Sequence, residues 1–165
     1  MSAPPTGRLI RTERGYDLLL TRALKDPLAE VWASVTEPER TARWFGPWEG
    51  EGGAGTTVRV HLTAEDGEPP AEVRIDACDA PHHLAVTMSD ESGGWRLELH
   101  LTEHEGTTAL QFTHHLDSLD GLGEIGPGWE FYLDRLVAAV DDTPLPGFDE
   151  YYPAQKAYYE AEPGL

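Results

Sequence analysis

Through the middle of the chain, apolar and polar residues alternate, a period of two that is typical of strands with one buried face. The alternation is clearest in five runs, at 58–62, 73–77, 84–88, 95–101 and 110–114. Turns rich in glycine, proline and acidic residues separate these runs. Closely spaced strands of this kind predict an antiparallel meander with one dry face and one wet face.

Two further segments extend the predicted sheet. Residues 16–24 form an apolar run of strand length, and residues 48–51 are expected to form a short edge strand before the glycines of 52–55. Counting both, the chain should contain about seven strands. Their common dry face needs a cover from another element.

Helical spacing appears on both sides of the strand runs. Between 27 and 45 we expect two short helices, the first with Asp26 as N-cap and Pro27 in its first turn, the second opened by the T-x-x-E capping box of 36–39. After 128 an apolar stripe recurs at helical spacing: Trp129, Tyr132, Leu133, Leu136, Val137 and Val140. This long helix is the predicted cover, and the fold class is therefore α+β.

The chain divides into three parts. Residues 1–15 are expected to be a loose N-terminal arm, residues 16–142 the folded domain, and residues 143–165 a tyrosine-rich extension. The extension is either a docking surface, ordered by a partner or by dimerisation, or a short helix folded back on the domain. Four glycines and a proline within 121–128 predict either a gate beside the long helix or a plain connector.

Charge and cysteine content narrow the function. Thirty acidic residues against twelve basic ones give a formal charge of −18, and such a field repels nucleic acid and anionic lipid. The single cysteine, Cys78, cannot form an internal disulfide. No apolar run reaches the length of a signal peptide or a spanning helix. We therefore expect a cytoplasmic protein with no nucleic-acid or membrane partner.

Three stretches carry a resemblance to a known family: DPLAEVWASVTEPERTARWFGP at 26–47, GTTALQFTHHL at 106–116 and GWEFYLDRLVAAV at 128–140. In this order they resemble the activator-of-heat-shock-protein-ATPase-like branch of the START-related, birch-pollen-allergen-like superfamily. The resemblance covers roughly residues 16–142. It implies a helix-grip fold, in which a long C-terminal helix lies across a curved seven-stranded antiparallel sheet and leaves an apolar cavity beneath it.

The resemblance leaves three functions open, because related proteins include lipid carriers, hormone receptors, polyketide cyclases, aromatases and cochaperones. The leading hypothesis is a carrier or sensor that binds a small hydrophobic or aromatic molecule under the long helix. The first alternative is a cofactor-free cyclase, aromatase or dehydratase in which His114 and Tyr132 move protons. The second is a cochaperone-like interaction module, and either a protein partner or a homodimer would suit it.

Strand parity, the helical stripe and the opening segments together predict the residues that line the cavity. Tryptophans are prominent among them, since each offers a broad apolar face and one N–H donor. The predicted lining comprises Trp32, Trp44, Phe45, Val60, Leu62, Val73, Val86, Trp95, Leu97, Leu99, Phe112, His114, Trp129, Tyr132, Leu133 and Leu136.

Metal binding and catalysis find little support in the sequence. Neighbours on one strand point to opposite faces, so neither His82-His83 nor His114-His115 is expected to converge on one metal ion. His61 and His100 share the wet face and could meet only if their strands were neighbours. We therefore expect no metal site and no cofactor, and no catalytic residue can be named.

Overall fold

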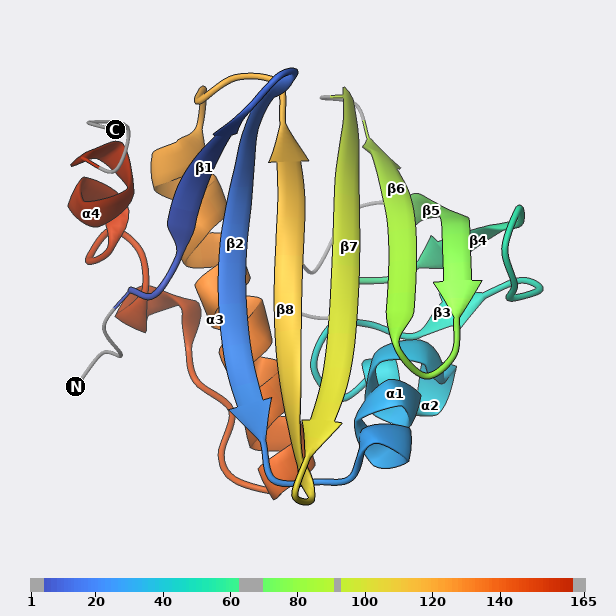
Figure 1. Cartoon of the computed structure of the whole chain (residues 1–165). Helices are drawn as coiled ribbons and strands as arrows, with labels where there is room; N and C mark the ends of the chain where they lie inside the picture. Colours follow the sequence, from blue (N-terminus) through green and yellow to red (C-terminus); the bar gives the residue numbers. More distant parts are fainter. Residues whose placement is uncertain (1–4, 63–69, 91–92, 162–165) are drawn as a thin grey trace.

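The computed structural model describes residues 5–62, 70–90 and 93–161. Within these residues one antiparallel sheet has the order β1-β2-β8-β7-β6-β5-β4-β3, and helix α3 runs along one of its faces (Figure 1). The strands are β1 (Arg8–Thr12), β2 (Gly15–Leu24), β3 (Trp48–Glu49), β4 (Thr57–Val60), β5 (Ala71–Asp79), β6 (His83–Asp90), β7 (Gly93–His104) and β8 (Thr107–Leu116). The helices are α1 (Leu28–Thr36), α2 (Pro38–Thr41), α3 (Leu122–Asp141), the 3-10 helix η1 (Phe148–Glu150) and α4 (Lys156–Ala161).

The predicted α+β helix-grip architecture is confirmed, with one addition to the sheet. The sheet has eight strands in the described residues, because part of the expected N-terminal arm forms β1 and pairs with β2 in a hairpin. Leu9 explains why this segment is ordered, since its side chain is buried in the main core while its neighbours are exposed. None of the described helices is long and apolar enough to cross a bilayer.

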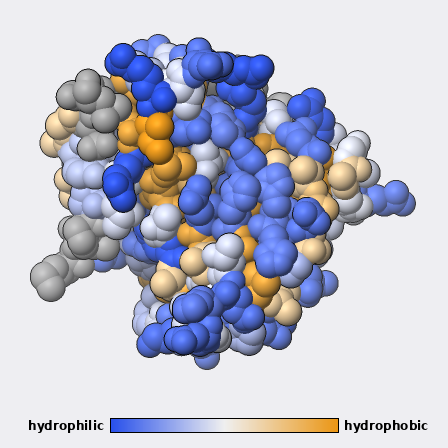
Figure 2. Space-filling view, in the orientation of Figure 1, coloured by the Kyte–Doolittle hydropathy of each residue, from blue (hydrophilic) through white to orange (hydrophobic). Residues whose placement is uncertain are grey.

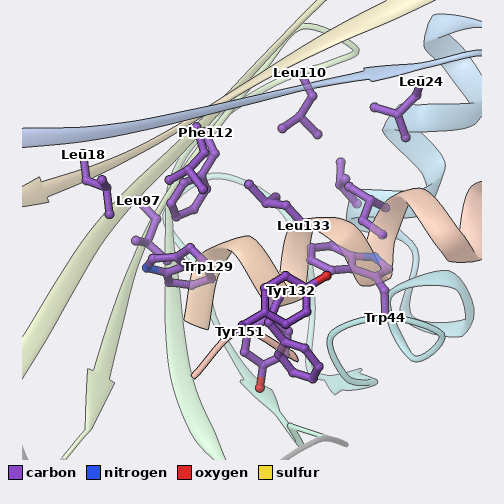
Figure 3. Close-up of a cluster of buried hydrophobic side chains, with 14 of the residues drawn as sticks. Leu18, Leu24, Trp44, Leu97, Leu110, Phe112, Trp129, Tyr132, Leu133 and Tyr151 are labelled. Atoms are coloured by element: carbon purple, nitrogen blue, oxygen red, sulfur yellow. The ribbon is translucent and has the colours of Figure 1, made fainter. Parts of the chain in front are cut away.

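Helix α3 covers the half of the sheet formed by β2, β8 and β7. Leu133 and Leu136 of the helix are almost completely buried in one core cluster with Leu18 and Leu110 of the strands. Figure 3 labels Leu133 of the helix and Leu110 of the sheet within this cluster. A second, smaller cluster of valines lies at the other end of the sheet, on β4 and β5. The interior therefore consists of a main core under α3 and a second, smaller buried cluster beyond it.

The short helices start differently from the prediction. Pro27 itself occupies the N-cap of α1 in an extended conformation, and the N–H of Leu28 donates to Oε2 of Glu103 at 2.9 Å. Thr36 is the last residue of α1, where its hydroxyl donates to the carbonyl of Trp32 at 2.7 Å. The prediction of a capping box at 36–39 is therefore wrong, because Thr36 already ends helix α1.

The glycine-rich segment is part of α3 rather than a connector before it. The helix begins at Leu122, after Gly121 with a φ of 77°. A Cβ at Gly126 would lie 2.4 Å from a ring carbon of Tyr159 in α4, whereas one at Gly128 would meet nothing within 4 Å. The predicted connector is therefore wrong for residues 122–128, and Gly126 lets α4 pack closely on α3. The gate stays a prediction.

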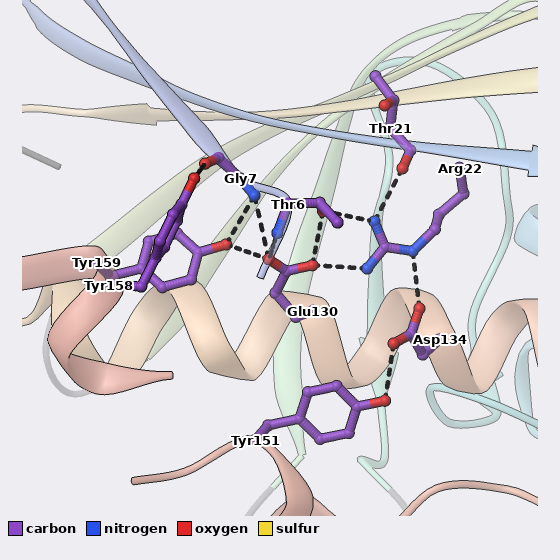
Figure 4. A network of polar contacts seen from close by, with 9 residues as sticks. All are labelled: Thr6, Gly7, Thr21, Arg22, Glu130, Asp134, Tyr151, Tyr158 and Tyr159. Carbon is purple, nitrogen blue, oxygen red and sulfur yellow. Dashed lines mark hydrogen bonds and ion pairs between the residues drawn. The ribbon is translucent and has the colours of Figure 1, made fainter. Parts of the chain in front are cut away.

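A buried polar network holds the two ends of the chain against α3 (Figure 4). Glu130, which is 1% exposed, accepts hydrogen bonds from the backbone and hydroxyl of Thr6 and from the hydroxyl of Tyr159. Arg22 of β2 pairs with Glu130 at 2.7 Å and with Asp134 at 2.8 Å. The tyrosine-rich extension thus folds back on the domain, as one of the two predicted alternatives required.

The network keeps the carboxyl group of Glu130 ionised. Burial alone would raise the pKa of Glu130, but the hydrogen bonds from Tyr159, Thr6 and Arg22 outweigh it and lower that pKa below its ordinary value. Burial and the carboxylate of Glu130 both raise the pKa of Tyr159, so the phenol stays protonated and donates. Helix α3 is consequently fixed to β2 and to both chain ends at one position.

Candidate functional site

An apolar cavity of about 260 Å³ lies between the concave face of the sheet, α3 and the segment that joins α1 to β3. It occupies the junction between the main core and the valine cluster of β4 and β5. The cavity is partly open to solvent. Its place in the fold is the one that the resemblance to helix-grip proteins implied.

The floor of the cavity is formed by inward-facing side chains of the strands. Those side chains are almost all aliphatic, since each strand directs its apolar positions to the same face. They come from Val58, Val60, Val73, Ile75, Leu84, Val86, Met88, Leu97, Leu99 and Phe112.

The side wall is built by α1, α2 and the loop to β3, and tryptophan N–H groups hold it in place. Trp44 Nε1 donates to the carbonyl of Ser34 at 2.8 Å. Trp48 Nε1 donates to the carbonyl of Thr36 at 3.0 Å. Both bonds end at the last turn of α1, whose carbonyls have no partner within the helix. Each indole is therefore anchored by its polar edge while its apolar face borders the cavity.

Helix α3 closes the cavity with Trp129 and Leu133. The ring of Trp129 lies 4.6 Å from that of Phe112 and 6.5 Å from that of Phe45, centroid to centroid. Arg135 of the same helix donates from Nε to the carbonyl of Trp44 at 2.8 Å. This hydrogen bond links α3 to the side wall. The aromatic rings on the helix and in the wall are therefore held in fixed positions relative to one another.

His114 lies behind Trp129 and away from the cavity. It is 3% exposed, and its Nδ1 accepts a hydrogen bond from Nε1 of Trp129 at 3.1 Å. Burial, and then the positive charges of His115 and Arg96, lower the pKa of His114 to about 4. The imidazole is therefore neutral near pH 7 and orients the indole that forms the cavity wall.

The structure brings most of the predicted lining residues together around this cavity. Ten of the sixteen line it, and all belong to the floor, the side wall or α3: Trp44, Phe45, Val60, Val73, Val86, Leu97, Leu99, Phe112, Trp129 and Leu133. The other six are placed elsewhere: Trp32, Leu62, Trp95, His114, Tyr132 and Leu136.

Those six residues support the cavity or fill the core beside it. Leu136 is fully buried in the main core, and Leu62 packs against the valine cluster. The ring of Trp95 lies 4.9 Å from that of His114, on the side of Trp129 away from the cavity. The cavity is thus displaced towards β4, β5 and β6 relative to the prediction.

Sequence reasoning missed most of the side wall. Val35, Thr36, Thr41 and Trp48 line the cavity, together with Gly52 and Gly53 near its exposed edge. Helical spacing does mark Val35 as apolar and inward-facing, and this signal could have identified it. The glycines carry no such signal, because their place depends on how β3 and β4 pair.

A curved antiparallel sheet gripped by a long C-terminal helix, with an apolar cavity between them, defines the chain as a helix-grip protein. The model of the activator of Hsp90 ATPase homolog 1-like protein family matches residues 25–141, and the chain belongs to this family. The resemblance found in the sequence is confirmed. No curated protein sequence matches the chain.

Solved structures share the whole fold. CalU16 from Micromonospora echinospora is similar over 98% of both chains, with 25% identity and a TM-score of 0.77. A Bordetella parapertussis protein encoded by BPP1335 is 23% identical over 97% of this chain and 93% of its own, with a TM-score of 0.73. DynU16, a putative protein in the dynemicin biosynthetic locus, is 21% identical with a TM-score of 0.71. That match covers 80% of this chain and 50% of DynU16.

Proposed function

We propose that this protein binds a small hydrophobic or aromatic molecule in the cavity between the sheet and α3, as a carrier or sensor. The observation that carries the proposal is the cavity itself, about 260 Å³ in volume and lined almost wholly by aliphatic and aromatic side chains. Ligand sites for small molecules are typically apolar concavities with few polar groups. Most of this lining is built from strands and from anchored indoles.

The aromatic rings favour a planar ligand. The cavity is bordered by Trp44 and Phe45 from the side wall and by Trp129 from α3. Aromatic faces stack well on flat apolar molecules. The likeness to DynU16, which is encoded in a biosynthetic locus, supports a role alongside small-molecule metabolism.

The enzyme hypothesis draws less support from the site. It requires His114 and Tyr132 to act on a bound substrate, but neither residue lines the cavity. The low pKa of His114 and its bond to Trp129 suit a positioning role better than proton transfer. The site also gives less support to the hypothesis of an interaction module, because a filled interior would suit that function better than this cavity does.

The test is a fluorescence titration with N-phenyl-1-naphthylamine, a neutral aromatic probe, on the full chain. The wild type should bind the probe saturably. Val86→Phe adds a ring on the cavity floor and should weaken binding by about tenfold or more. Ile10→Phe adds the same ring at a position 49% exposed on β1 and should leave binding unchanged.

Two outcomes would overturn the proposal. One is no saturable binding by the wild type. The other is equal affinity in the wild type and Val86→Phe, which would place the probe outside the cavity. Thermal unfolding of each variant shows that the protein titrated is folded, and Val60→Phe provides a second floor variant should Val86→Phe fail to fold.

A further inference from the structure

A cluster of histidine and carboxylate side chains lies on the face of the sheet opposite α3, and one of its residues, Glu98, also borders the cavity. This face is mainly hydrophilic over β8, β7 and β6 (Figure 2). The pairing of the strands places His83 of β6 directly opposite His100 of β7. Glu98 is two residues before His100 on β7 and therefore points to the same face. Three residues with metal-ligating groups thus come from two neighbouring strands.

The ligand atoms of these three residues are close enough to share one ion. Nε2 of His83 lies 2.8 Å from Oε1 of Glu98, and Nε2 of His100 lies 3.6 Å from the same oxygen. One ligand atom from each residue can be chosen so that all lie within 4.8 Å of one another. Ligands around a tetrahedral zinc ion, each at about 2.0–2.2 Å, are roughly 3.3 Å apart. Side-chain rotations are needed to bring this set to that geometry.

Neighbouring groups hold the glutamate in the required orientation. His115 of β8 bonds through Nε2 to Oε2 of Glu98, and through Nδ1 to Oδ1 of Asp17 at 2.8 Å. Oε2 is thereby engaged, and Oε1 is directed at the two imidazoles. The rings of His83 and His100 are stacked with centroids 4.5 Å apart, so at least one ring has to rotate before the in-plane lone pairs of both point to one ion. Outer hydrogen bonds that orient ligands in this way are characteristic of metal sites.

We propose that His83, Glu98 and His100 bind a divalent transition-metal cation, with zinc as the best fit. Two imidazoles and one carboxylate match the preferences of zinc, and three protein ligands leave a fourth position for water or another ligand. The formal charge of −18 raises the local concentration of cations near the surface. The proposal departs from the sequence-based expectation of no metal site, which considered neighbours along a strand and the pair of His61 and His100, and not the pairing of His83 with His100.

The site shares only Glu98 with the lining of the proposed ligand cavity, and its test uses a different probe. Untagged full-length protein, freed of metal by a chelator, is titrated with zinc by calorimetry. One equivalent should bind, and His83→Ala or His100→Ala should weaken that binding by about tenfold or more. His104→Ala, which removes an exposed histidine at the end of β7, is the matched control and should leave affinity unchanged.

A measurement without variants complements the titration. Nitrogen-15 NMR of the wild-type imidazoles should show zinc-dependent shifts at His83 and His100 and none at His104. Weak binding of several equivalents that persists in the His83→Ala, His100→Ala double variant would show nonspecific attraction to the acidic surface. That result, or imidazole signals unmoved by zinc, would overturn the proposal.

Discussion

Nε1 of Trp129 donates a hydrogen bond to Nδ1 of His114, 3.1 Å away, and both side chains are buried. The bond requires a lone pair on Nδ1, so His114 must be neutral there. Trp129 in turn forms the α3 side of the cavity. The protonation state of one buried histidine is therefore linked to the position of a cavity wall.

This link predicts a pH dependence of stability. The pKa of His114 is about 4 in the folded protein against 6.5 for an ordinary histidine, so folding favours the neutral form. The contribution is fully present above pH 6.5 and is lost as the pH falls through about 4, a loss of about 3 kcal/mol. Urea titrations across this range should show that loss in the wild type. In His114→Asn, which cannot take up the proton, the dependence should be smaller by that amount; equal slopes would contradict the assignment.

Leu136 should be among the most costly core positions. Its side chain is fully buried between α3 and the sheet. Leu136→Ala removes buried methyl groups and leaves a void, so it should lower the free energy of unfolding by about 2–5 kcal/mol. Leu145→Ala, at a position 45% exposed, should change it by less than about 0.5 kcal/mol. Similar losses in the two variants would show that Leu136 is not in the core.

Arg22 should matter far more than a surface arginine that makes an equally short ion pair. Arg22→Met leaves the buried carboxylate of Glu130 without its cation and should cost about 3 kcal/mol in free energy of unfolding. Arg40 pairs with Glu30 at 2.7 Å, but the two side chains are 38% and 54% exposed. Arg40→Met should cost far less, because an ion pair exposed to solvent contributes little to stability. Chemical denaturation of both variants measures the difference, and equal costs would refute the role given to burial.

Two glycines of α3 should respond in opposite ways to alanine. Gly128→Ala adds a methyl group in open space and should stabilise the helix by up to about 1 kcal/mol. Gly126→Ala places its Cβ against the buried ring of Tyr159 and should displace α4. Limited trypsin digestion should then cleave after Lys156 faster in Gly126→Ala than in the wild type or in Gly128→Ala. Equal digestion of all three would show that α4 does not depend on this contact.

The sequence predicted the strand runs and the long helix well because both are recorded in local periodicity. The alternation along 95–101 and 110–114 became β7 and β8, and the stripe from Trp129 to Leu136 became the buried face of α3. β1 was missed because a five-residue strand with one buried side chain has no period to detect. The capping box failed because the same threonine can end one helix as readily as it begins another.

The candidate site was predictable only in part, for a related reason. Strand parity correctly directs Val73, Leu97 and Phe112 inward, but parity does not say how far along the sheet the covering helix extends. That limit is set by α3 packing on β2, β8 and β7, so the valine cluster of β4 and β5 is covered by Phe45 and Trp48 instead of by the helix. The pairing of His83 with His100 was hidden for the same reason, since register between strands is a long-range property.

The hydrogen bonds that join Gly7, Glu130 and Tyr159 affect the rate at which the protein unfolds. Gly7 donates its N–H to the hydroxyl of Tyr159 across 152 positions of sequence, and that hydroxyl also binds Glu130. Closing so long a loop is entropically costly until the sheet and α3 have brought its ends together, so these bonds should be absent from the folding transition state. Interactions formed after the transition state act on the unfolding rate. Tyr159→Phe should therefore accelerate unfolding in stopped-flow experiments, with little effect on the folding rate. These hydrogen bonds are thus a source of kinetic stability.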